Sequence, residues 1–318
     1  MITLSKIAKL AHVSVSTASK AFSMSSEVSE QTRQEVFRVA QEYGCFKKFY
    51  NAKYPKFVIA VICPEFLGQH YTTMVALLQE QLLQLGCEVC VASTNFSAEA
   101  EAELLEYYHN YSNVDGSVII DGKTAIPASY EIPVVSISPR PDANVGVRLC
   151  TDCSEAMLQA VEHFLAHGVR RIGFLGEART NRKLTFFRET AEARQAVCEP
   201  VVVTERRFEE GGYAAMEQLL AKGDLPRALV CAYDHLAIGA IRCLADHGLS
   251  VPEDVAILGM DDIPDAEYLL PRLSSVNFRT GEICRLAAQS ILDLLHTRPA
   301  NPVITLPAQL RLRESTAF

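Results

Sequence analysis

The sequence lacks any long apolar run and any recognisable export leader. Hydrophobic residues make up 49% of the 318 positions, yet no stretch approaches the roughly 20 apolar residues that a membrane-spanning helix requires. An amphipathic helix is predicted from Leu4 onward, where a charged and then apolar leader would have to lie. We therefore expect a cytoplasmic protein with no membrane partner, long enough to form two or more packed domains.

The sequence also lacks the short motifs that accompany common enzyme chemistries. It contains no GxGxxG, GxxxxGK[ST], HExxH or GxSxG pattern. Asp261 and Asp262 are adjacent carboxylates, but neighbouring side chains after a strand diverge, so the two are not expected to work as a paired acid and base. We therefore predict that the protein is not an enzyme and uses no cofactor.

Cysteine is too sparse for a disulfide scaffold. Ten cysteines in a chain of this length, without an export signal, are expected to be reduced thiols. Cys87 and Cys90 lie in a predicted strand, where a separation of three residues points their side chains to opposite faces. Cys150 and Cys153 flank a predicted strand-to-helix turn, but no second pair or histidine stands at zinc-binding spacing. We predict core thiols and no metal site.

The N-terminal segment has the pattern of three short helices. Thr3 is placed to cap a helix over residues 4–11, and Ser14 to cap a second helix over residues 15–22. A third helix begins after Ser29. The first two helices are joined by a turn of only two residues, which is typical of a helix-turn-helix.

The second predicted helix has a small apolar inner face and a polar, cationic outer face. Three residues at helical spacing point outward: Val15, Ser16 and Lys20. A helix-turn-helix seats its second helix in the major groove of DNA, and short polar and cationic side chains suit that contact. An acid-rich outer face would instead indicate a small bundle without nucleic acid.

Charge is divided unequally between the two ends of the chain. Residues 1–56 carry nine Lys or Arg and four Asp or Glu, a net charge of +5, whereas the whole chain carries −8, which leaves −13 on residues 57–318. Only the basic N-terminal part gains by releasing counterions from DNA phosphates. Polyanion binding is therefore predicted at that end alone.

The runs LSKIAKLAHVSVSTASKAF and VSEQTRQEVFRVAQEYG resemble the DNA-binding head of the lactose-repressor/galactose-repressor (LacI/GalR) family of bacterial transcription regulators, and the resemblance continues through the whole chain. It implies that Val15, Ser16 and Lys20 face the base edges. The side chains that it implies at phosphates are Ser14, Thr17 and Ser19. We take residues 1–48 as the helix-turn-helix DNA-binding domain and double-stranded operator DNA as its partner.

Residues 49–56 are the expected hinge or linker, within the basic and aromatic segment CFKKFYNAKYPK. The resemblance implies a short hinge helix that forms on the operator and levers an apolar side chain into the minor groove. The family's usual start is altered, because Cys45 and Lys47 stand at its tyrosine and proline positions. Two interpretations stay open: Tyr54 acts as the wedge, or the segment is a solvated linker in which Lys47 and Lys48 touch phosphates only.

From Phe57 onward, predicted strands and helices alternate in two consecutive sets. The first set runs from FVIAVIC to IPVVSIS and the second from RIGFLG to VAILGM. Such alternation predicts an α/β fold with parallel sheets covered by helices. The resemblance implies a two-lobed, periplasmic-binding-protein-like body with three crossovers. We expect residues 57–318 to be the effector-binding and dimerisation domain, with lobe 1 at about 57–167 and 276–296 and lobe 2 at about 168–275 and 297–318.

The resemblance also places candidate effector-binding residues at strand ends that face a cleft between the lobes. They are His70, Tyr71, Asp152 or Glu155, Lys183, Tyr233 and Asp261. Lys183 replaces an arginine of the family, and an ammonium cannot reproduce the planar fork, which argues against bidentate recognition and leaves a phosphate partner open. Tyr233 replaces an asparagine, and Asp234 is expected to cap the next helix. Asp261 matches the family's ligand-binding aspartate and can accept two adjacent hydroxyls.

The sequence therefore predicts a ligand-responsive, sequence-specific transcription regulator. A repressor is favoured, with a small-molecule effector such as a sugar or sugar-phosphate closing the lobes. We expect a homodimer, because one small head buries too little DNA surface for tight selectivity. The candidate interface residues are Leu83, Leu269 and Leu270. The alternative is a solute-binding receptor or a cleft enzyme on the same two-lobed fold, which export of the protein or turnover of a cleft ligand would support.

Overall fold

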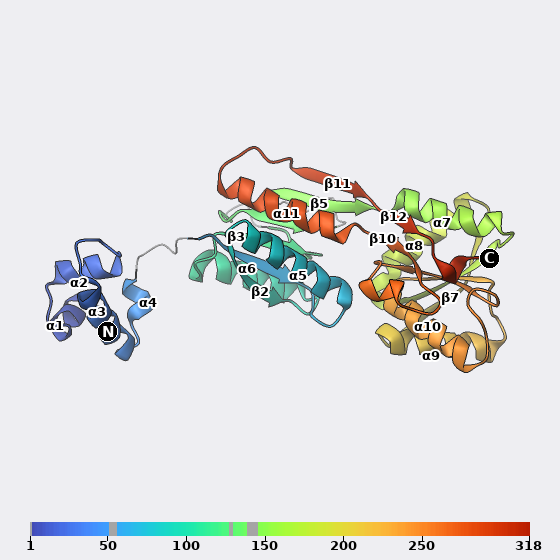
Figure 1. Ribbon diagram of the computed structural model, residues 1–318, viewed down its shortest axis with the longest axis horizontal. Helices are drawn as coiled ribbons and strands as arrows, with labels where there is room; N and C mark the ends of the chain where they lie inside the picture. Colours follow the sequence, from blue (N-terminus) through green and yellow to red (C-terminus); the bar gives the residue numbers. More distant parts are fainter. Residues whose placement is uncertain (1, 51–55, 127–129, 139–145) are drawn as a thin grey trace. The chain divides into compact units, whose positions relative to one another are not determined.

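The computed structural model of the protein describes residues 2–50, 56–126, 130–138 and 146–318. It contains two compact units, Met1–Lys56 and Phe57–Phe318 (Figure 1). Within the described ranges, none of the helices combines the length and the apolar character that crossing a bilayer would need.

The described part of the first unit is a small bundle of short helices. They are α1 (Leu4–Leu10), α2 (Val15–Phe22), α3 (Glu30–Glu42) and α4 (Phe46–Phe49). The side chains of Thr3, Ser14 and Ser29 each accept a hydrogen bond from the backbone N–H three residues further on. The caps predicted at Thr3 and Ser14 are confirmed. Capping oxygens satisfy N–H groups that a helix start leaves unpaired, which is why these helices begin where they do.

Helix α4 was not predicted, and it shifts the end of the head. Phe46 and Phe49 pack on Phe22, with ring centroids 6.1 and 5.7 Å away, and Phe46 also meets Phe37 at 4.9 Å. The expected boundary after residue 48 therefore cuts through a packed helix and is corrected. Aromatic packing, which a search for helical periodicity does not detect in four residues, keeps Phe49 with the head.

Each lobe of the second unit contains a six-stranded sheet among its described residues. The first sheet has the order β11 (Val303–Pro307), β5 (Val147–Asp152), β4 (Val134–Ile137), β3 (Gly116–Ile120), β1 (Val58–Cys63), β2 (Glu88–Ser93). The second has the order β12 (Gln309–Arg311), β10 (Ser274–Asn277), β9 (Ala256–Met260), β8 (Ala228–Cys231), β6 (Arg171–Glu177), β7 (Val197–Thr204). Neighbouring strands are parallel except β10 and β12. The predicted α/β fold with parallel sheets is confirmed.

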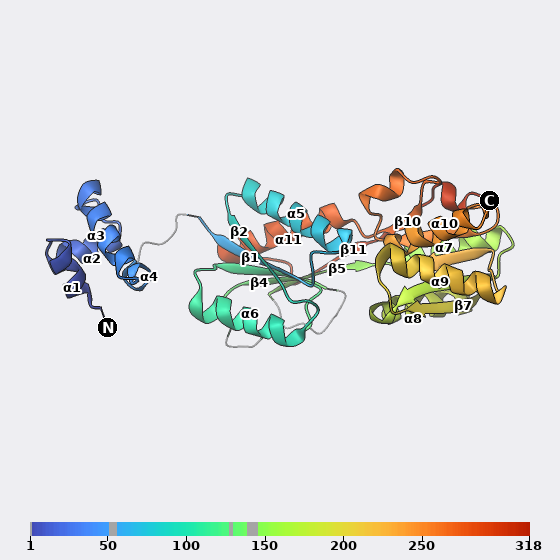
Figure 2. The ribbon, with the colours of Figure 1, turned by 90° about the horizontal axis from the view of Figure 1, so that it is seen from below.

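Helices cover both faces of each sheet. In the first lobe, α5 (Gln69–Gln84) and α11 (Thr280–Leu295) pack on one face and α6 (Ala98–Tyr111) on the other (Figure 2). Cys87 joins the core under α5 and Cys90 the core under α6, so their predicted opposite directions are confirmed. The helices of the second lobe are α7 (Ser154–Ala166), α8 (Asn181–Ala193), α9 (Phe208–Lys222) and α10 (Asp234–Asp246), with short 3-10 turns η1 (Ala178–Thr180), η2 (Pro264–Glu267) and η3 (Glu314–Thr316).

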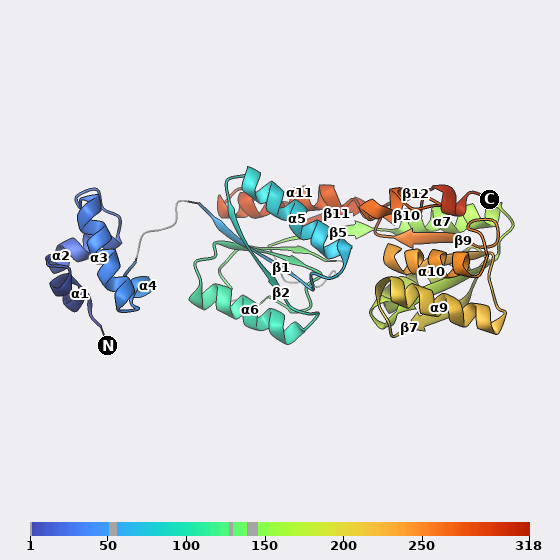
Figure 3. The same ribbon diagram turned by 60° about the horizontal axis from the view of Figure 1, so that its bottom comes forward.

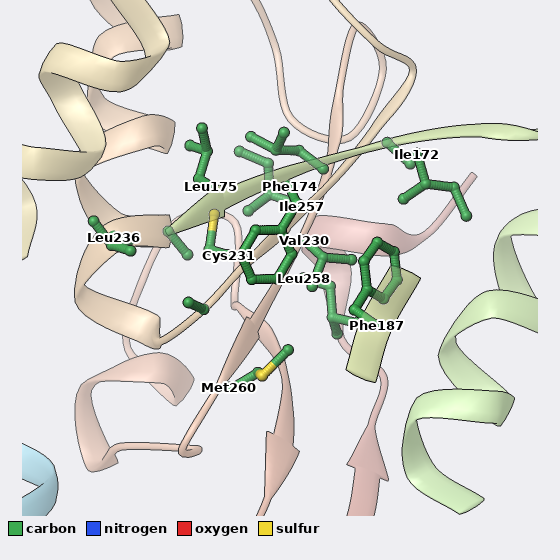
Figure 4. Packing of buried hydrophobic residues seen from close by; sticks show 14 of the residues in the cluster. Ile172, Phe174, Leu175, Phe187, Val230, Cys231, Leu236, Ile257, Leu258 and Met260 are labelled. Carbon is green, nitrogen blue, oxygen red and sulfur yellow. The ribbon is translucent and has the colours of Figure 1, made fainter. Parts of the chain in front are cut away.

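The core of the second lobe is continuous from strand to helix. Phe174 of β6 stacks on Phe187 of α8 at 5.8 Å, beside Val230 of β8 and Leu258 of β9 (Figure 4). Strands β8 and β9 are buried along their whole length. Helices on both faces of a parallel sheet require such uninterrupted apolar strands.

Two expected lobe assignments are wrong. Helix α7, expected in lobe 1, belongs to the second lobe, where Met157 and Phe164 lie in its core. Strand β11, expected in lobe 2, pairs with β5 of the first sheet. The chain crosses over directly after β5 and again between β11 and β12. Local periodicity identifies a strand or a helix but carries no information on which sheet it joins.

Helices α9 and α10 lie side by side (Figure 3), and they pack closely because a glycine of each helix lies against the backbone of the other. A Cβ at Gly239 would lie 1.9 Å from the backbone oxygen of Glu209, and a Cβ at Gly212 would lie 2.0 Å from that of Leu236.

Gly239→Ala is expected to lower the free energy of unfolding by about 1–3 kcal/mol or more, because the backbone of α9 cannot move aside as a flexible side chain can. Urea denaturation would measure it. Gly281→Ala in α11, where a Cβ meets nothing within 4 Å, should leave stability unchanged or raise it.

Candidate functional site

The outer face of α2 is exposed and polar. Val15 is 47% exposed, and Ser16 and Ser19 also lie on the surface. Ser14 accepts the backbone N–H of Thr17 at 2.9 Å, and the two hydroxyls are 2.8 Å apart. The outward direction of this stripe agrees with the sequence pattern. A helix face of short polar side chains can approach base edges and phosphates closely.

Lys20 on the same face already has a partner. Its ammonium forms an ion pair with Glu27, in the connection between α2 and α3, and the two side chains are 44% and 66% exposed. An exposed pair of this kind contributes at most about 1 kcal/mol. Only a weak intramolecular contact therefore holds the Lys20 ammonium. The remaining predicted DNA contacts, Lys47 and Lys48, lie in α4, and Tyr54 lies outside the described residues.

Three predicted effector-binding residues meet between the lobes. Lys183 of α8 donates to Asp261 Oδ1 at 3.2 Å and to the carbonyl oxygen of Ala232 at 2.7 Å. His70 Nδ1 lies 3.9 Å from the same carboxylate oxygen. Burial lowers the pKa of His70, so the ring is neutral at neutral pH and can accept or donate a hydrogen bond. The ring of Phe278 lies 5.3 Å from the Lys183 ammonium.

Tyr71 extends this cluster on the first-lobe side. Its hydroxyl donates to Asp121 Oδ2 at 3.3 Å, and Lys123 donates to the same oxygen at 3.0 Å. Burial, together with the nearby carboxylates, raises the pKa of Tyr71, which keeps the hydroxyl protonated. His70 and Tyr71 are in edge contact at 5.2 Å. The predicted aromatic pair therefore faces polar groups on both sides of the cleft.

A cavity of about 370 Å³ opens beside the cluster, lined by residues that include His70, Asp261 and Arg279. Its size lies in the range of small-molecule sites. A larger hollow of about 610 Å³ lies between α8 and the start of β7, lined by Arg188 and Cys198 among others. That hollow is remote from the strand ends that carry the candidate residues, so the smaller cavity is the candidate ligand space.

Asp261 and Asp262 point in different directions, as the sequence predicted. Asp262 accepts hydrogen bonds from Arg313 at 2.7 Å and from Asn277 at 2.6 Å, whereas Asp261 faces Lys183. Both aspartates have positive φ, 102° and 51°. Positive φ is uncommon outside glycine and is maintained here by the contacts on each carboxylate. Asp262 therefore fixes the loop, whereas Asp261 is directed at Lys183 and His70.

Asp234, the first residue of α10, also supports the loop that carries Asp261 and Asp262. Its carboxylate is fully buried and accepts hydrogen bonds from Ile263 N–H at 2.8 Å and from the Ser275 hydroxyl at 2.6 Å. Burial raises the pKa of Asp234 well above its ordinary value. The expected role as a helix cap is wrong, because Tyr233 occupies the N-cap position and Asp234 is the first helical residue. Its two carboxylate oxygens instead accept hydrogen bonds from residues about 30 to 40 positions further along the chain, at Ile263 and Ser275.

Three other predicted effector residues do not join the Asp261 cluster. Asp152 accepts the N–H and hydroxyl of Ser154 at 2.9 and 2.6 Å, and these bonds lower its pKa. Glu155 bonds to a side chain one turn further along α7. The buried Tyr233 hydroxyl accepts the N–H of Phe208 at 3.0 Å. The side-chain hydrogen bonds described for Asp152 and Glu155 are local, and Tyr233 contacts a different loop.

Sequence reasoning missed several residues of the cleft. Asp121 follows β3, Phe96 follows β2 and Phe278 follows β10, and each contacts a residue of the cluster or its neighbours. The position of Asp121, directly after the buried run GSVII, was a usable signal, since ligands bind at the carboxyl ends of parallel strands. The aromatic residues carry no such signal, because buried aromatics are usual in any core.

The predicted interface leucines differ in exposure. Leu270 is 91% exposed, Leu83 is 47% exposed, and Leu269 instead packs partly against the core of the second lobe. Tyr268, which the sequence did not single out, is 85% exposed. Leu269 is therefore a weaker candidate for contact with another chain than Leu270.

Both units match known protein families. A model of bacterial regulatory proteins of the lacI family matches residues 3–45, and a model of a periplasmic binding protein-like domain matches residues 161–316. The probable HTH-type transcriptional repressor ExuR of Bacillus subtilis (strain 168) is 26% identical over 312 residues, which span 93% of this chain and 92% of that protein.

Solved structures resemble the whole chain. The lac repressor dimer bound to operator and the anti-inducer ONPF matches with a TM-score of 0.73 at 21% identity and covers 99% of both chains. The transcriptional regulator CelR in complex with cellobiose matches with a TM-score of 0.68 at 25% identity, over 99% of this chain and 100% of that chain.

A helix-turn-helix unit and a two-lobed binding-protein unit in one chain define a DNA-binding transcription regulator with a ligand-binding body. The chain belongs to the LacI/GalR family of bacterial transcription regulators.

Proposed function

We propose that this regulator is a homodimeric repressor whose affinity for operator DNA changes when a small molecule binds between the two lobes of its body. The observation that carries the proposal is the meeting of Asp261 and Lys183 of one lobe with His70 of the other beside a cavity of ligand size. The regulator acts in the cytoplasm, without a cofactor and without turnover of its effector.

The effector we propose is a sugar or sugar-phosphate. Asp261 can accept two adjacent hydroxyls, and His70 and Tyr71 offer further hydrogen bonds beside an aromatic surface. Lys183 is suited to a phosphate or a single hydroxyl, because an ammonium is a point charge without the planar fork of arginine. The related CelR structure contains cellobiose, which supports a carbohydrate in this type of cleft.

The coupling follows from linkage between ligand binding and lobe closure. A ligand that contacts both lobes stabilises the closed body, and it can change operator affinity only by its differential affinity for the two states. In a dimer, the relative position of the two bodies sets the separation of the two heads over their half-sites. The lac repressor relative is a dimer bound to operator, which supports the same assembly here.

The experiment that tests the proposal identifies the effector first. Native mass spectrometry of the purified protein, followed by extraction, would reveal a small molecule retained in the body. That molecule is then added to the protein on an operator selected from a pool of random duplexes, with fluorescence anisotropy as the measurement. A changed operator affinity supports the proposal. If no sugar-like compound binds and no duplex is selected, the proposed function is wrong.

Replacing Lys20 with alanine is expected to weaken operator binding by about 1–3 kcal/mol and to relax base preference, because its ammonium reaches a base edge. Anisotropy on the selected operator and on a random duplex would measure both effects. Lys48→Ala should weaken binding to the two duplexes alike. Glu27→Gln, which releases Lys20 from its ion pair, should not weaken either. Equal losses on both duplexes for Lys20→Ala would contradict the base-reading role.

A further inference from the structure

The three crossovers between the lobes all lie toward one side of the body. They follow β5, β10 and β11, and these strands lie at or next to one edge of the two sheets. Strands β1 and β2 lie at the other edge of the first sheet, and β6 and β7 at the other edge of the second. The lobes are therefore covalently joined on one side, while the described part of the chain makes no connection on the opposite side, which is free to open.

An ion pair spans the lobes on this unconnected side. Arg207, at the N-cap position of α9, donates through both terminal nitrogens to the two carboxylate oxygens of Glu65, in the loop after β1, at 2.7 and 2.6 Å. Glu65 is only 5% exposed. Glu177 at the end of β6 adds a second carboxylate, 3.4 Å from Arg207 Nε. The hydrogen bonds that Arg207 donates to Glu65 raise the pKa of Arg207, and bidentate geometry of this kind is directional as well as strong.

Aromatic rings from both lobes enclose the same guanidinium. Phe208 of the second lobe lies 4.4 Å from the Arg207 guanidinium carbon and Phe96 of the first lobe 5.7 Å from it. Arg179 of the second lobe also stacks on Phe96, at 4.5 Å. These contacts shield the pair from water and cross the lobe boundary themselves. None of these residues lines the 370 Å³ cavity.

We propose that Glu65 and Arg207 form a clasp, which holds the two lobes in contact and must break before the lobes can separate on this side. A buried ion pair adds little net stability, because desolvation offsets its attraction, but it forms in one geometry only. Here that geometry exists only when the lobes touch. Opening the body separates the loops that carry Glu65 and Arg207, and both hydrogen bonds of the pair are then lost together. The closed and open arrangements are therefore two distinct states.

Hydrogen exchange of the full-length, effector-free protein tests the clasp, and it does not depend on the proposed DNA or effector roles. Glu65→Gln is isosteric and leaves Arg207 with Glu177. Peptides covering 64–71 and 205–212 should exchange at least about fivefold faster in this variant, because the closed state no longer protects them. Peptides from β3 and β8, in the two lobe cores, should be unchanged. Glu210→Gln is the matched control, since its partner Arg206 lies in the same lobe and both are exposed.

The outcomes separate a clasp from a general effect on stability. If Glu65→Gln and Glu210→Gln give the same exchange at both loops, the clasp does not exist. If β3 and β8 also exchange faster in Glu65→Gln, the variant Arg207→Lys distinguishes a clasp from a general loss of stability. Lysine keeps the positive charge but cannot donate two parallel hydrogen bonds to Glu65 as the guanidinium does. Faster exchange at the two loops alone in Arg207→Lys supports the clasp, and wild-type exchange in that variant overturns it. A double variant, Glu65→Gln with Arg207→Gln, should be no more open than either single variant.

Discussion

Replacing Leu270 with aspartate is expected to convert the protein to a monomer and to weaken operator binding about 100-fold or more. Two heads held in one dimer bind adjacent half-sites as a single ligand, so the second contact costs little additional entropy. Leu270 is 91% exposed and stands beside the 85% exposed Tyr268, and such apolar groups are most simply explained by contact with a second copy. A carboxylate at that contact would be buried against apolar surface without a partner.

Analytical ultracentrifugation of the full-length variant and anisotropy on the operator would measure the two effects together. Leu83→Asp on α5 is expected to act in the same direction. Val197→Asp is the matched control, because Val197 is an apolar side chain 48% exposed on the edge strand β7, outside the proposed interface. A Leu270→Asp protein that still sediments as a dimer and binds its operator normally would contradict this interface.

Replacing Asp261 with alanine is expected to abolish the response to effector while leaving operator affinity in its absence near that of the wild type. The loss of effector affinity should be about 1–3 kcal/mol, because a hydroxyl that enters the cleft is left without its acceptor. The change also removes the carboxylate bound by Lys183. Isothermal titration calorimetry with the molecule retained by the purified protein would measure it.

Asp262→Ala separates ligand binding from loop support. Its carboxylate is bound by Arg313 and Asn277, so removing it should lower the thermal unfolding midpoint more than the corresponding change at Asp261. If Asp261→Ala binds the effector with wild-type affinity in calorimetry, the site has been assigned to the wrong carboxylate.

The head could be predicted from the sequence because its signals are local. Caps at Thr3 and Ser14 act within three residues, and the apolar positions of α2 repeat at helical spacing. The alternation of strands and helices in the body was predictable for the same reason, since burial on both faces of a parallel sheet leaves unbroken apolar runs. The short helix α4 was missed because four residues contain too little periodicity, and only the contacts of Phe46 and Phe49 explain it.

The membership of each lobe could not be predicted in the same way. Helix α7 has an ordinary apolar stripe that would suit either lobe, and β11 has a strand pattern that would suit either sheet. Their places depend on where the chain crosses between lobes, which is a property of strand pairing over more than 150 residues, as in the pairing of Cys150 with Thr305. Pairing energy of this kind comes from neighbours that are distant in the sequence.

The sequence by itself determined the class of protein: a short polar helix face on a basic head, a parallel α/β body, and an aspartate after the strand that ends at Met260. The tertiary structure decided that Asp234 supports a loop instead of capping a helix, and that Glu65 and Arg207, 142 residues apart, meet across the lobes. The physical reason is the difference in sequence separation over which these interactions act. Capping and periodicity act over a few residues, whereas the partner of a charged side chain is selected by the folded arrangement of the whole body.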